Sequence, residues 1–232
     1  MITGFLNAWS NLRQRTAAFL GGECVLCRAH AADGAVCPAC AATLPGTGPA
    51  CPQCAAPSPA GAVCGRCLAH PPRFDAVTAA YLYAYPADAL VQAFKYGGNH
   101  AAGRFLGRAL AARVHERPDL VVPIPLAPGR LAERGFNQAV ELARTVCHAH
   151  GYPLATHACR RVRETPSLTH MAHAERAKSI RDAFVCDANV AGKTVAVVDD
   201  VVTTGATLNE LARMLKRAGA ARIISWVAAR TP

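Results

Sequence analysis

Residues 197–208 of this 232-residue chain, VVDDVVTTGATL, indicate the fold. The apolar run has the character of a buried strand, yet two adjacent carboxylates, Asp199 and Asp200, stand where the strand should end. A loop of threonine and glycine follows, and Thr207 with Glu210 has the spacing of a capping box that starts a helix. We therefore expect a strand, a loop and a helix, with both acids at the carboxyl end of the strand.

The loop after the acids has the composition of a phosphate site. Backbone N–H groups at a helix N-terminus bind phosphate, Gly205 permits close approach, and neighbouring threonines add hydroxyl donors. A P-loop places a lysine next to its threonine, which this loop does not, so one phosphate is favoured over a triphosphate. The acids would repel phosphate unless they accept hydrogen bonds from a sugar diol, so the stretch predicts a ribose 5-phosphate moiety. The alternative is a metal clasp followed by an ordinary turn.

Strand-like and helix-like segments alternate after residue 73. The strand-like segments are 76–85, 118–126, 193–200 and 221–229. The helix-like segments are 87–97, 99–117, 136–150 and 207–220. Asn137 is the expected N-cap of the third helix. This alternation predicts an α/β fold with a mostly parallel sheet flanked by helices, and ligands bind such sheets beyond the carboxyl ends of the strands.

Eight of the 11 cysteines form four Cys-x-x-Cys knuckles. Two intervening residues let both sulfurs face one ion from a tight turn, which suits tetrahedral zinc. The alternative is a disulfide scaffold, which needs an oxidising compartment, whereas the N-terminal stretch has arginines inside its apolar pattern, unlike a secretory signal. We therefore predict that zinc is bound by Cys24, Cys27, Cys37, Cys40, Cys51, Cys54, Cys64 and Cys67.

The knuckles are an internal duplication, because adding 27 to each cysteine number of the first four gives the second four. A duplicated unit should be self-contained, so we expect knuckles one and two to share one Zn²⁺ and knuckles three and four another. Crossed pairing stays open, because spacing does not exclude it. The remaining cysteines show no ligand spacing and are expected to be ordinary small apolar residues; they are Cys147, Cys159 and Cys186.

The formal net charge of +10 is unevenly distributed: residues up to Pro72 carry +2 and the rest carry +8. Four thiolates around one Zn²⁺ have a net charge of about −2, so two such sites would make the cysteine module mildly acidic. Such a module is a poor clamp for a phosphate backbone. We expect it to have a structural or docking role and expect phosphate to be the partner of the second half.

Three regions are expected: an amphipathic helix over 1–20, a double zinc ribbon over 21–72, and the α/β domain over 73–232. The helix has apolar residues at helical spacing, and we expect it to lie on the protein; a membrane surface is the alternative. A composition of 52% hydrophobic and 17% charged residues is typical of a folded protein. The apolar runs fall short of the roughly 20 residues of a membrane span, and we expect a cytoplasmic protein.

The motifs together resemble a known family. VAVVDDVVTTGATL is similar to the phosphoribosyl pyrophosphate (PRPP) motif of type I phosphoribosyltransferases. More narrowly, the four knuckles, KYGG, VVPIPL, RGFNQA and RRVRETPS…AERAKSIRDAF resemble the ComF family, which includes competence-associated proteins. The resemblance covers nearly the whole chain after the N-terminal helix.

The resemblance implies roles for individual residues. Asp199 and Asp200 would bind the ribose hydroxyls. Arg130 and Arg134, in a loop after an earlier strand, would contact pyrophosphate, which the planar guanidinium suits. The residues that would cradle the 5-phosphate are Thr203, Thr204, Gly205, Ala206 and Thr207.

The segment ETPSLTHMAHAERAKSIRDAF is expected to be a mobile loop that closes over the leaving group. Its Arg176, Lys178 and Arg181 are candidate catalytic charges, with a solvated basic face as the alternative. Leu168 and Ser179 replace the glutamine and asparagine common in the family, which bears on catalysis more than on binding. Lys95 of KYGG matches the family, but its role is not evident from the sequence.

Two functions follow. The first is Mg²⁺-assisted transfer of the phosphoribosyl group from PRPP, with release of pyrophosphate to an acceptor that the sequence does not identify. The second is a non-catalytic module that senses PRPP or binds single-stranded DNA in transformation, with competence proteins as partners. The family's link to DNA uptake applies to both.

Overall fold

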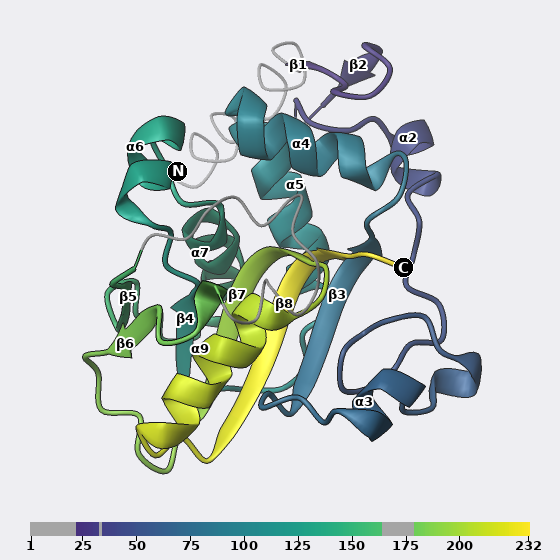
Figure 1. The fold of residues 1–232 in the computed structure, drawn as a ribbon. Coiled ribbons are helices and arrows are strands. Elements are labelled where there is room, and N and C mark those ends of the chain that lie inside the picture. The colour runs from purple at the N-terminus through teal and green to yellow at the C-terminus, as the bar shows by residue number, and fades with distance from the viewer. Residues whose placement is uncertain (1–21, 33, 164–178) are drawn as a thin grey trace, which may run out of the picture.

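A four-stranded parallel sheet lies at the centre of the computed structural model, which describes residues 22–32, 34–163 and 179–232 (Figure 1). The strand order is β3(Ala76–Leu82)–β8(Arg222–Arg230)–β7(Thr194–Val202)–β4(Leu120–Pro123). The two central strands are buried on both faces, which explains their near-continuous apolar sequence. The α/β prediction is confirmed. The expected helix over 1–20 lies outside the described residues.

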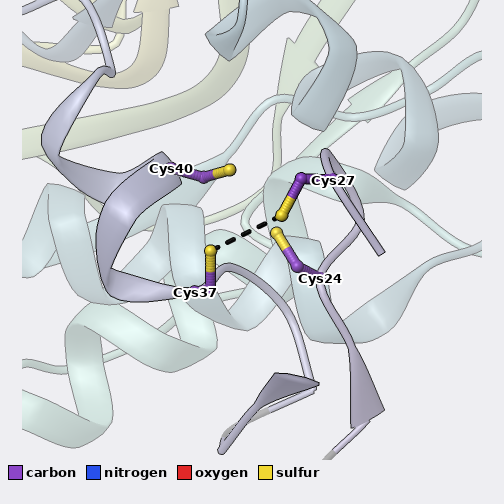
Figure 2. A group of neighbouring side chains, drawn as sticks. All are labelled: Cys24, Cys27, Cys37 and Cys40. Carbon is purple, nitrogen blue, oxygen red and sulfur yellow. Dashed lines mark hydrogen bonds between the residues drawn. The ribbon is translucent and has the colours of Figure 1, made fainter. Parts of the chain in front are cut away.

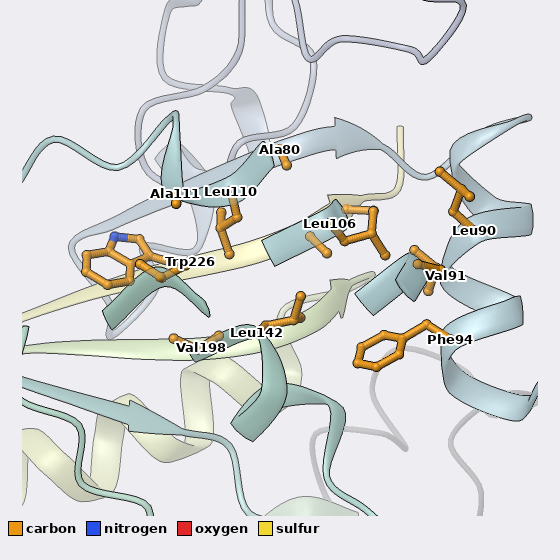
Figure 3. Close-up of a cluster of buried hydrophobic side chains, with 14 of the residues drawn as sticks. Ala80, Leu90, Val91, Phe94, Leu106, Leu110, Ala111, Leu142, Val198 and Trp226 are labelled. Atoms are coloured by element: carbon orange, nitrogen blue, oxygen red, sulfur yellow. The ribbon is translucent and has the colours of Figure 1, made fainter. Parts of the chain in front are cut away.

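Helices cover both faces of this sheet. The helices on one face are α4(Ala87–Gly97), α5(His100–Ala111) and α7(Gln138–His150). The other face carries α9(Ala206–Arg217). Trp226 of β8 packs with Leu106, Leu110 and Leu142 in the core beneath the first group (Figure 3). Alternate residues of each strand serve the two cores, so both helical layers are fixed by the same sheet.

Helix boundaries follow local chemistry. The predicted N-cap is confirmed, because the Asn137 side chain accepts a hydrogen bond of 2.9 Å from the N–H of Ala139. Gly98, at φ +60°, ends α4 in the left-handed region that suits glycine. The second predicted helix is shorter than expected and ends at Ala111. A seven-residue helix, α6(Pro128–Arg134), begins at a proline and precedes α7.

One prediction about the opening stretch is wrong, and the strand end differs by two residues. Strand β7 contains both acids near its carboxyl end, as expected, but runs two residues past Asp200 to Val202, because its pairing with β8 extends that far. Helix α9 is not started by a capping box: it begins at Ala206 after Gly205, without a side-chain cap. The Glu210 carboxylate instead accepts a hydrogen bond from a backbone N–H of the segment before β6.

A small antiparallel hairpin flanks the expected mobile loop. It consists of β5(Cys159–Arg161) and β6(Phe184–Cys186). Between these strands the structure describes residues up to 163 and from 179 onward, so Leu168, Arg176 and Lys178 lie outside it. Helix α9 fixes the second end of the loop, because Arg213 binds Glu210 and Asp182 together.

The cysteine-rich region packs along the sheet domain. Its short elements are β1(Gly22–Glu23), β2(His30–Ala31), α2(Pro38–Ala42), η1(Pro59–Gly61) and α3(Gly65–Ala69). Buried residues of the first ribbon join the core beneath α4 and α5, whereas those of the second join the core beneath α9. The two ribbons therefore support different faces of the sheet. Within the described part of the chain, every helix is too short or too polar to cross a bilayer.

Candidate functional site

The first four cysteines converge on one point. The sulfurs of Cys24, Cys27, Cys37 and Cys40 lie within 4.8 Å of one another and face a common centre (Figure 2). The Sγ atoms of Cys27 and Cys37 are 3.6 Å apart. A turn supplies the first pair and the start of α2 the second. Four sulfurs at these separations are the ligand set of a structural zinc site.

The second cluster repeats the first. Its members also lie within 4.8 Å of one another and are Cys51, Cys54, Cys64 and Cys67. The partition confirms that knuckle one pairs with two and knuckle three with four, and it rules out the crossed arrangement. Internal duplication predicted this correctly, because each unit carries its own complete ligand set.

Hydrogen bonds to sulfur lower the pKa of one thiol in each cluster. Burial raises the thiol pKa of Cys24, but backbone N–H groups outweigh burial and lower that pKa to about 6. The pKa of Cys51 is lowered to about 6 by the same balance, with the N–H of Cys64 3.4 Å from its sulfur. A thiolate is the form that binds zinc. The two clusters fit two zinc ribbon sites.

The paired acids face a lysine from another element. Lys95, near the end of α4, places its Nζ atom 2.9 Å from Oδ2 of Asp200. The lysine side chain is 22% exposed and the aspartate side chain 12%. Oδ1 of Asp200 accepts a hydrogen bond of 2.6 Å from the N–H of Val201, and Oδ1 of Asp199 accepts one of 2.8 Å from the N–H of Asp200. The acids are thus held by the chain and by one cation.

The charges of this group are unequal. Burial, with the neighbouring Asp200 carboxylate, raises the pKa of Asp199 to about 7. Burial alone would lower the pKa of Lys95, but the adjacent Asp200 outweighs it and raises that pKa. Lys95 and the two acids together carry one negative charge above neutral pH, and Arg134 and Arg161 add positive charge around them. Carboxylate oxygens are ligands that Mg²⁺ accepts and also acceptors for sugar hydroxyls.

Arginine from α6 lies beside the same group. Nη1 of Arg134 donates to Oε1 of Gln138 at 3.1 Å, and its guanidinium carbon lies 5.3 Å from the ring centre of Tyr96. Nε2 of Gln138 is 3.5 Å from the carbonyl oxygen of Lys95. The ends of α4 and α6 and the start of α7 therefore meet near the acids. Arg130 lies one turn earlier in α6 and is half-buried.

Arg181, the candidate catalytic charge that the structure describes, lies on the surface. The Arg181 side chain is 74% exposed, and its Nε atom lies 3.9 Å from a carboxylate oxygen of Asp182. Its carbonyl oxygen accepts a hydrogen bond of 2.8 Å from Arg163. The described part of the structure therefore presents Arg181 to solvent. Ser179 is half-buried beside the segment that the structure does not describe.

Two arginines bind carbonyl oxygens of the loop between β7 and α9. Gly205 has φ +76°, and Oγ1 of Thr204 accepts a hydrogen bond of 3.3 Å from the N–H of Ala206. Nη2 of Arg66, in the second ribbon, donates to the carbonyl oxygen of Thr204 at 2.7 Å. Nη1 of Arg230 donates to the carbonyl oxygen of Thr203 at 2.8 Å. Thr207 lies in the first turn of α9.

Three residues of this region were missed or left without a role. Lys95 matched the family's KYGG, but its partner is 105 positions away in the sequence, so only the fold reveals the ion pair. Arg66 lies between two cysteines of a knuckle, so nothing in the sequence indicated that it contacts the loop after β7. Arg230 ends strand β8 after an apolar run, and a cation at a strand's carboxyl end is a signal that could have identified it.

Family comparisons agree with this geometry. The profile of the phosphoribosyl transferase domain matches residues 100–232, and that of the double zinc ribbon domain matches residues 16–68. The chain is 33% identical to DNA utilization protein YhgH of Salmonella typhimurium over 219 residues, 90% of this chain and 91% of that protein. It is 30% identical to competence protein F of Haemophilus influenzae over 225 residues, 91% of this chain and 98% of that protein.

Among solved structures, glutamine phosphoribosylpyrophosphate amidotransferase from B. subtilis aligns with a TM-score of 0.41 and 24% identity. That alignment covers 56% of this chain and 26% of the other. By its sheet, site and cysteine clusters, the protein is a phosphoribosyltransferase-domain protein with a double zinc ribbon. Within that class it belongs to the ComF family, together with the two relatives above.

Proposed function

We propose that this protein binds PRPP with Mg²⁺ and transfers its phosphoribosyl group with release of pyrophosphate. One observation carries the proposal: the acid pair at the end of β7 is poised by Lys95 directly before a loop that leads into a helix N-terminus. Acids that accept hydrogen bonds from a diol, placed next to a phosphate cradle, match ribose 5-phosphate.

Each group has a role in this proposal. Asp199 and Asp200 accept hydrogen bonds from the ribose hydroxyls, and Lys95 holds Asp200 in place. The loop 203–207 binds the 5-phosphate through its N–H and hydroxyl groups. Mg²⁺ supplies charge neutralisation for the pyrophosphate moiety.

Arginines serve the leaving group. Arg134 and Arg130 bind the pyrophosphate, and the loop charges Arg176, Lys178 and Arg181 stabilise its departure. The bond between ribose C1 and the pyrophosphate oxygen breaks, and pyrophosphate leaves with the electron pair. A bond forms between C1 and the acceptor, which loses a proton to solvent.

Pyrophosphate release tests this function. Protein, Mg²⁺ and PRPP are incubated with a panel of amine, nucleobase and hydroxyl acceptors, and pyrophosphate is measured by a coupled enzymatic assay. The proposal expects one acceptor class to give release that exceeds buffer hydrolysis and is lost in Asp199→Asn/Asp200→Asn. PRPP binding without release for any acceptor would remove the catalytic claim.

A second function is favoured by the departures Leu168 and Ser179 and by the names of the relatives. In it the protein senses PRPP without catalysis and acts on single-stranded DNA with competence proteins. Its location would be cytoplasmic, where reduced thiols are available to bind zinc. DNA binding whose affinity falls steeply with salt, measured on short single strands, supports this function; affinity that does not change with salt contradicts it.

A further inference from the structure

The second ribbon meets the candidate phosphate loop across a pocket. This pocket has a volume of about 420 Å³. Its lining includes Arg66 and His70 of the ribbon, Phe74 of the following segment, and Thr204 and Gly205 of the loop. The pocket therefore separates the second ribbon from part of the loop. Side chains that reach across it connect the two.

Two arginines make the crossing contacts. Arg66 comes from the knuckle that ends the second zinc cluster and donates to the carbonyl oxygen of Thr204 at 2.7 Å. Arg230 is 3% exposed and joins both sides: Nε donates to the carbonyl oxygen of Cys54 at 2.9 Å and Nη1 to that of Thr203 at 2.8 Å. The buried guanidinium of Arg230 thus binds the backbone of a predicted zinc ligand, Cys54, and the backbone of the loop.

These contacts set the direction of the loop's peptide groups. In a planar trans peptide, the C=O of one residue and the N–H of the next point in opposite directions. Because Arg230 holds the carbonyl of Thr203, the N–H of Thr204 points away from that guanidinium. Because Arg66 holds the carbonyl of Thr204, the N–H of Gly205 points away from the ribbon. Successive N–H groups aimed to one side form an anion-binding nest.

We infer that the second zinc ribbon is a structural part of the phosphate site, and that Arg66 is a positioning residue that orients the loop's N–H groups toward the phosphate. The inference rests on the proposed PRPP function. The first ribbon joins the core on the opposite face of the sheet, so its arginine, Arg28, does not share this role. The second zinc cluster holds the knuckle that carries Arg66 and so contributes to ligand affinity without touching the ligand.

The test compares Arg66→Met with Arg28→Met, a matched control in the first ribbon whose side chain is 83% exposed. Zinc content, affinity for ribose 5-phosphate by calorimetry, and hydrogen–deuterium exchange of the ligand-free loop are measured for each. We expect Arg66→Met to keep two zinc ions, to bind ribose 5-phosphate at least tenfold more weakly, and to exchange faster over 203–207. Arg66→Lys keeps one donor and should recover part of both losses, whereas Arg28→Met should match the wild type.

The readouts separate the two ideas. Wild-type binding with equal affinity in Arg66→Met overturns the positioning role and leaves the PRPP site standing. Failure of the wild type to bind either ribose 5-phosphate or PRPP refutes the proposed function. In that case loop exchange still decides the structural link: unchanged exchange in Arg66→Met overturns it, and faster exchange supports it.

Discussion

Replacing Asp199 with asparagine should stabilise the protein while abolishing its ligand site. Burial and the Asp200 carboxylate raise the pKa of Asp199 from 3.8 to about 7. An acid with a raised pKa binds more protons in the folded state than in the unfolded state. Its contribution to stability is therefore present below about pH 4 and is lost as the pH rises toward 7.

The magnitude follows from the shift. About three pKa units at about 1.4 kcal/mol each give about 4 kcal/mol of cost at pH 8. Asp199 is half-buried, so screening by solvent reduces this to between about 1 and 4 kcal/mol. Asparagine has nearly the same shape, keeps an oxygen acceptor for the N–H of Asp200 and carries no charge. The free energy of unfolding should rise by that amount at pH 8.

Urea denaturation of the zinc-loaded protein between pH 6 and 8 checks this. The advantage of Asp199→Asn should grow by about 1 kcal/mol across this range, because the wild type ionises there. The matched control is Lys95→Met, which leaves both acids without their cation. It should lower the free energy of unfolding by about 2–4 kcal/mol at pH 8. An Asp199→Asn protein less stable than the wild type, or with an advantage independent of pH, would refute the argument.

Three further outcomes are expected. Mass spectrometry under native conditions should find two zinc ions per chain, released together with loss of ribbon structure on acidification as thiolates protonate; a folded metal-free ribbon would contradict the two sites. Gly103→Ala should destabilise by about 1–2 kcal/mol in denaturation experiments, since overpacking against the buried Phe94 ring outweighs the helix gain of about 1. Gly97→Ala, at the end of α4 with open space around it, should instead stabilise by up to about 1 kcal/mol. Gly205→Ala should cost about 1 kcal/mol of stability because of its φ of +76°, with weaker binding of ribose 5-phosphate; unchanged stability would show that the loop relaxes without cost.

Local patterns in the sequence predicted most of the fold. Strand and helix periodicity located the four sheet strands, and the 27-residue repeat predicted which cysteines share an ion. Both patterns are local or strictly periodic, so they can be recognised without knowledge of tertiary contacts. The acids and the loop were also placed correctly at the carboxyl end of a parallel sheet.

Contacts between distant segments could not be predicted. The capping box failed because Glu210 pairs with Arg213 and with the N–H of Asp182 instead of the helix start. The ion pair of Lys95 and the loop contact of Arg66 join residues separated by 105 and 138 positions. Spacing rules carry no information about such pairs, and both lie where the ribbon or a helix end reaches the site.

Calorimetric titration of PRPP with Mg²⁺ into the zinc-loaded protein tests the central claim most directly. The account predicts saturable binding of one PRPP per chain to the wild type and its loss in Asp199→Asn/Asp200→Asn, with zinc content unchanged. Equal binding by the double variant, or no binding by the wild type, would contradict a ligand site formed by these acids and the loop after them.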